Sequence, residues 1–409
     1  MRISGFVTVL ILVAGCLLYS EYSDFYFDWE EYFARRGDPN TGLTVFPTLL
    51  IPMGGNYEGM GTAYTAVASD SGYIEANPSG SSILKMTELS FLHHNWIADS
   101  NIEGVVYSIR FNDLGIGVGG KFLYLPFTRY DPWGERQGKG YYSETVATLN
   151  VSYNFFSNYY FSGVALGTNV KIAYRNVPIA IYPDQSAFSA MVDVGVLTRL
   201  DFLKLFISRS KNFSLGAAVK NLGAFALGEP LPTVATVGVA YSPIRPVTLA
   251  FDLNLPFSLD QVNYPAESWN IASGFNVIVT DFLSVQSGVQ LKGDNPRFSV
   301  GSTLELDNIS FVANYNLDLS GQMSPVDKFS VEAKLNLGDM GRAELQKKSE
   351  ELYLDGLEAY AKGDIPEAIK HWEMVLQVDP KFIPARENIE TATRALQLQK
   401  EIEARQKLE

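Results

Sequence analysis

Polar and apolar residues alternate along most of the chain between residues 87 and 337. Residues 147, 149, 151, 153 and 155, for example, are all apolar or aromatic, and they are separated by Thr148, Asn150, Ser152 and Asn154. Side chains with this period of two lie on opposite faces of a β-strand. We count about fourteen such segments, which begin near residues 88, 102, 114, 142, 160, 186, 211, 232, 246, 267, 281, 297, 308 and 328.

The length of these segments favours a barrel in a membrane over a large soluble β protein. A tilted strand needs about nine to eleven residues to cross the hydrocarbon layer, whereas strands of soluble sandwiches usually have about five or six. The segments run for roughly ten to sixteen residues, and their polar faces carry Asn, Ser, Thr, Gly and Lys, which suit a barrel interior. We therefore predict an all-β transmembrane β-barrel of about 14 antiparallel strands over residues 87–340.

The connections between the segments alternate in length. Those after even-numbered segments are mostly tight turns, at residues 112–113, 157–158, 242–246, 280–281 and 307–308. Those after odd-numbered segments are mostly longer, at residues 126–140, 176–184, 222–231 and 256–266, while residues 201–210 and 293–295 depart from this rule. Outer-membrane barrels have short periplasmic turns and long outer loops. Both ends of the barrel are therefore expected in the periplasm.

Charge and composition narrow the class of protein. The 409 residues carry a net charge of -13 at pH 7, which argues against a nucleic-acid partner. Hydrophobic residues make up 46% of the chain, yet after the N-terminus no apolar run reaches the roughly eighteen residues of a membrane-spanning helix. A barrel distributes its apolar residues in this way, at every second position.

Residues 1–20 have the pattern of an export signal peptide, because Arg2 precedes an apolar stretch from Phe6 to Ala14. Cys16 is the only cysteine, and the residues before it resemble the lipidation site of bacterial lipoproteins. Two alternatives stay open. Either the mature protein begins at a lipidated Cys16, or Cys16 is removed with the signal peptide, and in both cases the mature chain has no disulfide bond.

Residues 21–86 lie between the predicted signal peptide and the predicted barrel, and their first part is predicted to form an N-terminal arm. An aromatic and acidic stretch at residues 21–36 is followed by a block of small residues at 59–70 and by a turn sequence at 77–80. The distinctive residues of this block are Gly59, Met60, Gly61, Asn77 and Pro78. Together with residues 214–223 and 231–241, the block resembles the FadL-like outer-membrane barrels, most closely an uncharacterised spirochaetal family related to the PorV group.

This resemblance implies a plugged channel, in which residues 21–86 form an N-terminal arm and a plug. In FadL-type transporters the N-terminal segment is a plug inside a fourteen-stranded barrel, and long-chain fatty acids leave sideways through a gap in the wall. The resemblance therefore makes the five residues Gly59, Met60, Gly61, Asn77 and Pro78 candidates for the plug's ligand path. For Asn77 and Pro78 the alternative is a turn that docks the plug against the wall.

The third segment is the candidate for the side exit. It carries Gly115, Gly117, Gly119 and Gly120, and glycine in a strand weakens pairing or permits a kink. Because FadL-type barrels open laterally at a kinked early strand, the resemblance implies a gap here. The alternative is close packing of the plug against a stretch of wall without side chains.

The sequence shows few groups suited to catalysis or metal binding. His93 and His94 are neighbours in one predicted strand, so their side chains point to opposite faces and cannot share a metal ion directly. The chain has no cysteine cluster, no phosphate-binding Gly-Lys-Ser/Thr loop and no Gly-x-Ser-x-Gly elbow. We therefore expect no enzyme, no metal site and no cofactor. A lipase built on a serine and one of these two histidines is the alternative.

Residues 341–409 are predicted to form a separate helical domain, because the apolar period changes there to about 3.6. Residues 352–380 resemble one tetratricopeptide repeat, with Gly356 and Ala368 where the paired helices touch, and residues 382–408 form a third helix. Tyr360 and Trp372 are the candidates for a partner groove. One repeat is too short to stand alone, so this TPR-like domain should pack on the barrel's periplasmic turns, on a second copy or on a partner. A simple helical cap without a ligand is the alternative.

Two functions are consistent with these features. The first is an outer-membrane channel, surrounded by outer-membrane lipid, for the uptake of long-chain fatty acids or other hydrophobic molecules, with a periplasmic protein partner bound through the helical domain. The second is a PorV-like structural or docking component of an outer-membrane export or assembly complex that acts through the periplasmic helical domain. A channel requires an apolar path through or beside the plug, whereas a docking protein requires a sealed barrel and an exposed binding surface.

Overall fold

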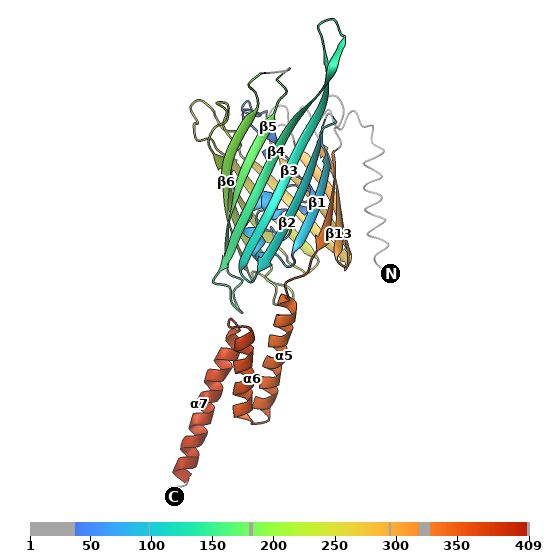
Figure 1. Cartoon of the computed structure of the whole chain (residues 1–409). Helices are drawn as coiled ribbons and strands as arrows, with labels where there is room; N and C mark the ends of the chain where they lie inside the picture. Colours follow the sequence, from blue (N-terminus) through green and yellow to red (C-terminus); the bar gives the residue numbers. More distant parts are fainter. Residues whose placement is uncertain (1–36, 98, 180–182, 294–295, 319–327, 407–409) are drawn as a thin grey trace.

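The computed structural model describes residues 37–97, 99–179, 183–293, 296–318 and 328–406 (Figure 1). Within these ranges the chain folds into a plug, a barrel and three C-terminal helices. The predicted signal peptide, Cys16 and the aromatic stretch at residues 21–36 lie outside the described residues.

The described strands close into one antiparallel barrel, in which each strand pairs with its neighbours in sequence and β1 pairs with β14. Their bounds are β1 (Glu88–Asn95), β2 (Asn101–Phe111), β3 (Leu114–Tyr130), β4 (Arg136–Phe155), β5 (Val164–Asn176), β6 (Ala187–Leu200), β7 (Phe213–Gly223), β8 (Val234–Tyr241), β9 (Val247–Pro256), β10 (Asn270–Thr280), β11 (Leu283–Leu291), β12 (Arg297–Leu306), β13 (Ile309–Asp318) and β14 (Lys328–Asn336). The predicted fold class of a 14-stranded antiparallel barrel is confirmed.

Apolar side chains cover the outside of the barrel and polar side chains fill its interior. In β4, Asn150 and Ser152 are buried, whereas Leu149 and Val151, which alternate with them, are 50% and 43% exposed. Exposed apolar side chains recur around the wall. This outer surface is therefore suited to contact with lipid and not with water. A closed sheet also leaves no unpaired edge, which a bilayer requires.

The two ends of the barrel differ. The short-turn face carries the connections after even-numbered strands, and the long-loop face carries those after odd-numbered strands. The prediction of a loop at residues 126–140 is wrong, because Leu125 still pairs with Tyr142 and Thr128 with Lys139. Aromatic and β-branched residues favour strand there, and outside the bilayer both faces can meet water, so no alternation marks the segment. β3 and β4 therefore extend as a hairpin beyond the other strands on the long-loop face (Figure 1).

The plug occupies the interior of the barrel. It contains η1 (Pro47–Leu50), α3 (Gly55–Gly59), α4 (Tyr73–Ala76) and η2 (Pro78–Ile83). Its apolar side chains pack in clusters against the inner wall, as Tyr73 and Ile74 do with Val106 and Leu197. This segment precedes β1 in the chain, as the sequence predicts.

The C-terminal helices α5 (Arg342–Ala361), α6 (Ile365–Val378) and α7 (Ile383–Gln406) lie at the short-turn face (Figure 1). The ring of Phe382 lies 4.8 Å from that of Tyr159, and Arg209 Nη1 lies 2.5 Å from Glu350 Oε1. Packing on the short turns is one of the three arrangements that the sequence left open. Among the described residues, no helix has both the length and the apolar content needed to cross a membrane.

Candidate functional site

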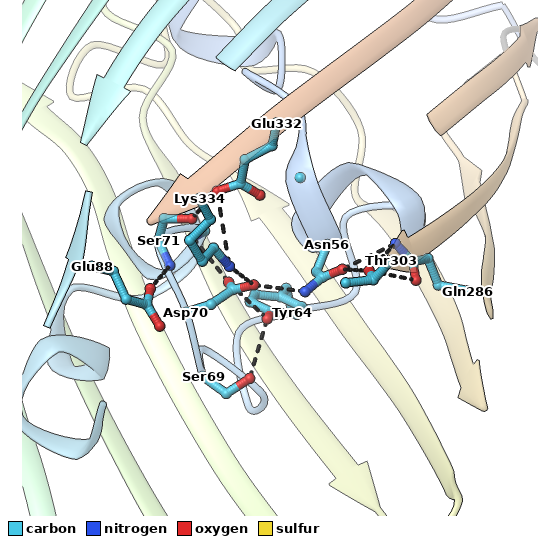
Figure 2. A network of polar contacts seen from close by, with 12 residues as sticks. Asn56, Tyr64, Ser69, Asp70, Ser71, Glu88, Gln286, Thr303, Glu332 and Lys334 are labelled. Atoms are coloured by element: carbon cyan, nitrogen blue, oxygen red, sulfur yellow. Dashed lines mark hydrogen bonds and ion pairs between the residues drawn. The ribbon is translucent and has the colours of Figure 1, made fainter. Parts of the chain in front are cut away.

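A buried polar network fastens the plug to the wall (Figure 2). At its centre is Asp70, whose Oδ2 lies 2.9 Å from Lys334 Nζ of β14. The same carboxylate accepts hydrogen bonds from Asn56 Nδ2 at 2.7 Å and from the Tyr64 hydroxyl at 2.8 Å. Burial alone would raise the pKa of Asp70, but the positive charge of Lys334 and these hydrogen bonds outweigh it and lower the pKa. Asp70 is therefore a carboxylate held by a cation from the wall.

The network continues on both sides of Asp70 (Figure 2). On one side, Ser71 N donates to Glu88 Oε2 at 3.1 Å and Ser71 Oγ donates to Glu332 Oε1 at 2.5 Å. On the other side, the side-chain oxygen Oδ1 of Asn56 accepts hydrogen bonds from Thr303 Oγ1 and Gln286 Nε2. The plug is thus bonded to β1, β11, β12 and β14 at one level of the barrel. The sequence showed the small residues of this block but not the charges that face them.

The two neighbouring histidines have separate environments. His93 points outward, with 49% of its side chain exposed, and pairs with Glu103, whereas the His94 side chain is fully buried. His94 Nδ1 lies 2.9 Å from the Pro52 carbonyl oxygen, and its Nε2 lies 3.3 Å from Glu58 of the plug. Burial raises the pKa of Glu58, although His94 opposes this. The prediction that the two histidines face opposite ways is confirmed, and His94 is a contact between plug and wall.

The predicted ligand-path residues of the plug all lie in contacts with the wall. Met60 is 1% exposed and packs against glycines of β10 and β11, between Gly59 and Gly61, which are also buried. Asn77 Nδ2 donates to the carbonyl oxygen of Val196 in β6 at 3.0 Å, and the Pro78 carbonyl accepts from Asn150 Nδ2 at 2.8 Å. This is the docking turn that was the alternative for Asn77 and Pro78. A role of these five residues on a ligand path would need the plug to move, and it stays a prediction.

Three of the four glycines of β3 allow the plug to approach the wall. A Cβ at Gly115 would overlap the backbone of Ser81 and Ser82, and one at Gly117 would overlap the Tyr73 hydroxyl. A Cβ at Gly119 would lie 2.5 Å from Ile74 Cδ1, whereas one at Gly120 would meet open space. Pairing of β3 with β2 and β4 is continuous at all four positions. Close packing therefore accounts for Gly115, Gly117 and Gly119, and a lateral gap at β3 stays a prediction.

A cavity of about 340 Å³ lies between the plug and the wall on the long-loop face. Its apolar lining includes Leu49, Ile51, Ile74, Val146, Leu231 and Phe257, from the plug, the wall and two long loops. Its basic side chains include Lys121, Lys171, Lys220 and Lys292. The cavity also reaches the backbone of Gly119 and Gly120, where β3 has no side chain on either face. It is a hydrophobic space with cations at its boundary.

Lys220 is the basic group of this cavity that has no partner. Lys121 Nζ lies 2.7 Å from Glu75, Lys171 Nζ lies 2.6 Å from Asp193, and Lys292 Nζ lies 2.7 Å from Glu267. In the described part of the chain, Lys220 makes neither a hydrogen bond nor an ion pair. The carboxylates of Asp252, Asp193 and Glu75 act on Lys220 only from beyond ion-pair distance. An anionic ligand would supply the direct partner that this cation lacks beside an apolar cavity.

A β-bulge places Asn221 beside Lys220 at the cavity. Val194 pairs with Val219 and Val192 with Leu222, so Lys220 and Asn221 together face the one residue Asp193. Asn221 has a left-handed φ of 60°, and its N–H donates to Asp193 Oδ1 at 2.7 Å. Because of the extra residue, two consecutive residues of β7 line the cavity. The sequence signal for this bulge is weak, since it is one asparagine that interrupts the alternation.

In the helical domain, the two predicted partner-groove residues have different exposures. Trp372 is 1% exposed, and its Nε1 donates to the Tyr353 carbonyl at 3.3 Å. Its indole packs on Gly356, which has no side chain to obstruct it. Tyr360 is 39% exposed, and its ring lies 5.8 Å from that of Trp372. Trp372 is therefore a core residue, and only Tyr360 can contact a partner directly.

Among the described residues, no cluster of three or more His, Cys, Asp or Glu side chains is placed to hold a metal ion.

Comparison with known proteins places the chain within a family. The model of an uncharacterised protein family, UPF0164, matches residues 36–340. A UPF0164 protein of Treponema pallidum (strain Nichols) is 29% identical over 379 residues, which is 88% of this chain and 85% of the relative. Another from the same strain is 28% identical over 397 residues, covering 87% of this chain and 76% of the relative.

Some solved structures resemble the barrel. The CymD monoaromatic hydrocarbon channel has a TM-score of 0.48 at 9% identity, covering 70% of this chain and 97% of that one. The Pseudomonas putida toluene transporter TodX has a TM-score of 0.47 at 11% identity, covering 70% of this chain and all (100%) of that one. We draw no functional conclusion from similarity at this level.

Proposed function

Because the chain belongs to the uncharacterised protein family UPF0164, we propose a function from its own geometry: it is an outer-membrane channel for hydrophobic molecules, with long-chain fatty acids as ligands. The long-loop face would then be outside the cell, and the short-turn face with the helical domain would lie in the periplasm. The observation that carries this proposal is the cavity beside the plug, which combines apolar walls with the unpartnered cation of Lys220.

This combination matches the two ends of a fatty acid. The alkyl chain would be removed from water by the apolar lining, at about 0.8 kcal/mol per buried methylene. The carboxylate would accept hydrogen bonds from Lys220, which has no carboxylate within ion-pair distance among the described residues. An uncharged hydrocarbon would gain only the first of these contributions. The cavity therefore favours fatty acids over alkanes of the same length.

Replacing Lys220 by Met tests this preference. A hydrogen bond to a charged group contributes about 1.5–3 kcal/mol, so Lys220→Met should weaken binding of dodecanoate by roughly tenfold to a hundredfold. Binding of dodecanol, which keeps the alkyl chain, should change little. The measurement is isothermal titration of each ligand into the full chain in neutral detergent.

The matched control is Lys292→Met, because Lys292 lines the same cavity but is neutralised by Glu267. It should leave dodecanoate binding close to that of the unmodified chain. Equal loss in both variants, or none in Lys220→Met, would remove Lys220 as the head-group site. The channel itself is tested by oleate uptake in Gram-negative cells that lack their own fatty-acid channel, and uptake no higher than without this chain would contradict it.

We also propose that ligand leaves the cavity sideways at β3. Gly120 faces outward between the exposed side chains of Val118 and Phe122, and Gly119 faces inward, so the wall there is bare backbone. A valine at Gly120 meets open space and should not disturb folding. Gly120→Val should nevertheless lower oleate uptake severalfold, because its side chain covers the exit.

The control for the side exit is Val118→Ile, which adds a methylene to the outer face of the same strand two residues away. Both variants should show the same heat-dependent gel mobility as the parent barrel. Unchanged uptake in Gly120→Val would mean that ligand does not pass β3, and a lateral gap there would have to be abandoned.

The alternative, a docking component, is favoured by the exposed apolar side chains of the helical domain. Leu398 and Ile402 of α7 are 60% and 56% exposed, and Leu354 of α5 is 61% exposed. In Figure 1, α7 extends past the ends of α5 and α6. A PorV-like or TPR-like role would use this surface to hold a periplasmic protein. Loss of a co-purifying partner in Leu398→Glu, with oleate uptake at background level, would favour this function over the channel.

A further inference from the structure

A second cavity, of about 790 Å³, lies on the short-turn face between the plug, the barrel turns and the helical domain. It is on the opposite side of the plug from the cavity described above. Six basic side chains line it, namely Arg110, Arg199, Arg209, Lys211, Arg342 and Lys381, against two acidic ones, Asp113 and Asp379. This excess of positive charge is local, because the whole chain carries a net charge of -13.

Three of the six cations are neutralised by carboxylates. Arg209 pairs with Glu350, Lys211 with Asp201, and Lys381 with Asp113. Lys381 also donates to Ser157 Oγ at 2.8 Å. Its partner Asp113 lines the same cavity, so this carboxylate already has a cation. The pairs of Arg209 and Lys381 join the barrel turns to the helical domain, whereas Lys211 and Asp201 pair within one connection, between β6 and β7. Arg110, Arg199 and Arg342 are the cavity's basic residues that form no such pair among the described residues.

The remaining three arginines contact only uncharged oxygens of the described chain. Arg110 Nη1 and Arg342 Nη1 both donate to the carbonyl oxygen of Leu84, at 3.1 Å and 3.2 Å. Arg199 Nη2 donates to the Val67 carbonyl at 3.2 Å. Two guanidinium groups on one oxygen repel each other, and no carboxylate among the described residues pairs with any of the three.

Each guanidinium keeps hydrogen-bonding capacity for a ligand. A guanidinium has five N–H donors, and Arg199 uses one of them, at Val67. Arg110 uses its Nε for the Asn112 carbonyl and Nη1 for Leu84. Arg342 donates one N–H from each of its three nitrogens, to the carbonyls of Asp339, Leu84 and Lys85, and keeps the two others. Arginine forks bind carboxylate and phosphate groups through paired hydrogen bonds. The three residues therefore supply donors and charge for one oxyanion.

Apolar side chains complete the cavity. Ile83 of the plug, Phe161 and Leu197 of the barrel, and Leu345 and Phe382 of the helical domain also line it. An inorganic anion would use the arginines but not this surface. A molecule with an anionic head and a short alkyl chain would use both.

We propose that this cavity is a binding site for a small amphiphile with a carboxylate or phosphate head group, which Arg110, Arg199 and Arg342 hold. The three arginines come from β2, β6 and the first turn of α5, so the helical domain supplies part of the site. This role goes beyond the proposed channel and does not depend on transport, because it concerns equilibrium binding at the opposite face. An acidic segment of a periplasmic protein is the competing occupant.

Binding of four probes to the full chain in neutral detergent tests the proposal. Dodecanoate and dodecyl phosphate present the two head groups on the same alkyl chain, inorganic phosphate presents the head group alone, and dodecanol the chain alone. All titrations use the Lys220→Met background, so that the cavity on the long-loop face contributes little. We expect one of the two anionic amphiphiles to bind at least tenfold more tightly than inorganic phosphate or dodecanol, with an affinity that falls as salt rises.

Arg199→Gln is the main variant, because glutamine can still donate to the Val67 carbonyl and the arginine makes no contact with the helical domain. It should weaken binding of the amphiphile at least tenfold, while Arg199→Lys, which keeps the charge, should restore part of it. The matched control is Arg386→Gln on α7, an exposed arginine that also donates to one carbonyl, of Pro380, but lies outside the cavity. It should have no effect.

The position of the ligand is read from a photoreactive diazirine analogue of dodecanoate. Labelling of peptides that contain Phe161 or Leu345 supports the site, and labelling confined to the long-loop face overturns it. Unchanged affinity in Arg199→Gln also overturns it. If a Glu-rich peptide binds and both amphiphiles fail, the occupant is a protein segment and the proposal is wrong, whatever the result of the oleate uptake assay.

Discussion

Lys334→Met should release the plug from the wall and destabilise it by about 3–5 kcal/mol, the usual cost of removing one partner of a buried ion pair. Lys334 is the cation between Asp70 of the plug and Glu332 of the wall, at 2.9 Å and 3.9 Å. Without it, these buried carboxylates and Glu88 face each other across the contact between plug and wall. The expected result is a barrel of normal mobility whose conductance in planar bilayers is larger and noisier than that of the parent.

The control is Lys139→Met, which removes an exposed lysine from the hairpin outside the barrel wall and should leave the conductance unchanged. The double variant Asp70→Asn with Lys334→Met removes both charges of the closest pair and should recover part of the lost stability. If the conductance of Lys334→Met matched that of the parent, the polar network would not be what holds the plug.

Trp372→Ala should unfold the helical domain while leaving the barrel intact. Truncating a buried tryptophan costs about 3–5 kcal/mol of stability. The free energy of unfolding of a domain of three helices is little larger than that. The barrel should survive, because its hydrogen-bonded wall closes between β14 and β1 without the helices. Far-UV circular dichroism should lose the helical signal, and the heat-dependent gel shift of the barrel should remain.

Tyr360→Ala is the matched control for the tryptophan, since the two rings are in contact but Tyr360 is partly exposed. It should cost much less stability and keep the helices folded. A folded helical domain in Trp372→Ala would contradict the core position of the tryptophan. Loss of the barrel in the same variant would contradict the independence of the wall.

The difference between Tyr360 and Trp372 shows the limit of reading a helix from its sequence. Both are aromatic residues at positions typical of paired helices, so the sequence offers no reason to separate them. Their exposure depends on Gly356, which has no side chain and lets the indole approach α5. Which aromatic is buried is decided when the two helices pack.

The glycines of β3 show a similar limit. Four glycines in one strand predict either weak pairing of that strand or close packing of the plug against it. Both interpretations follow from the absence of side chains at these positions. The plug decides between them, because Tyr73 and Ile74 occupy the space inside Gly117 and Gly119. Gly120 has no such neighbour, so for this position the exit is still a prediction. The same holds for the fatty-acid ligand, the periplasmic position of the helices and the TPR class.

By itself, the sequence determined the barrel, its strands and their number, because each strand must expose one face to lipid and the other to the interior, and this leaves a period of two in the chain. It also indicated the change to helices near residue 341, and the family resemblance implied the plug segment. Only the tertiary structure decided which charges meet. Asp70 and Lys334 are far apart in sequence, and Arg110, Arg199 and Arg342 come from three separate elements. Lys220 and Asn221 line the cavity side by side because a bulge in β7 adds one residue opposite Asp193. Such contacts depend on register and on closure of the wall, and no local pattern of residues records them.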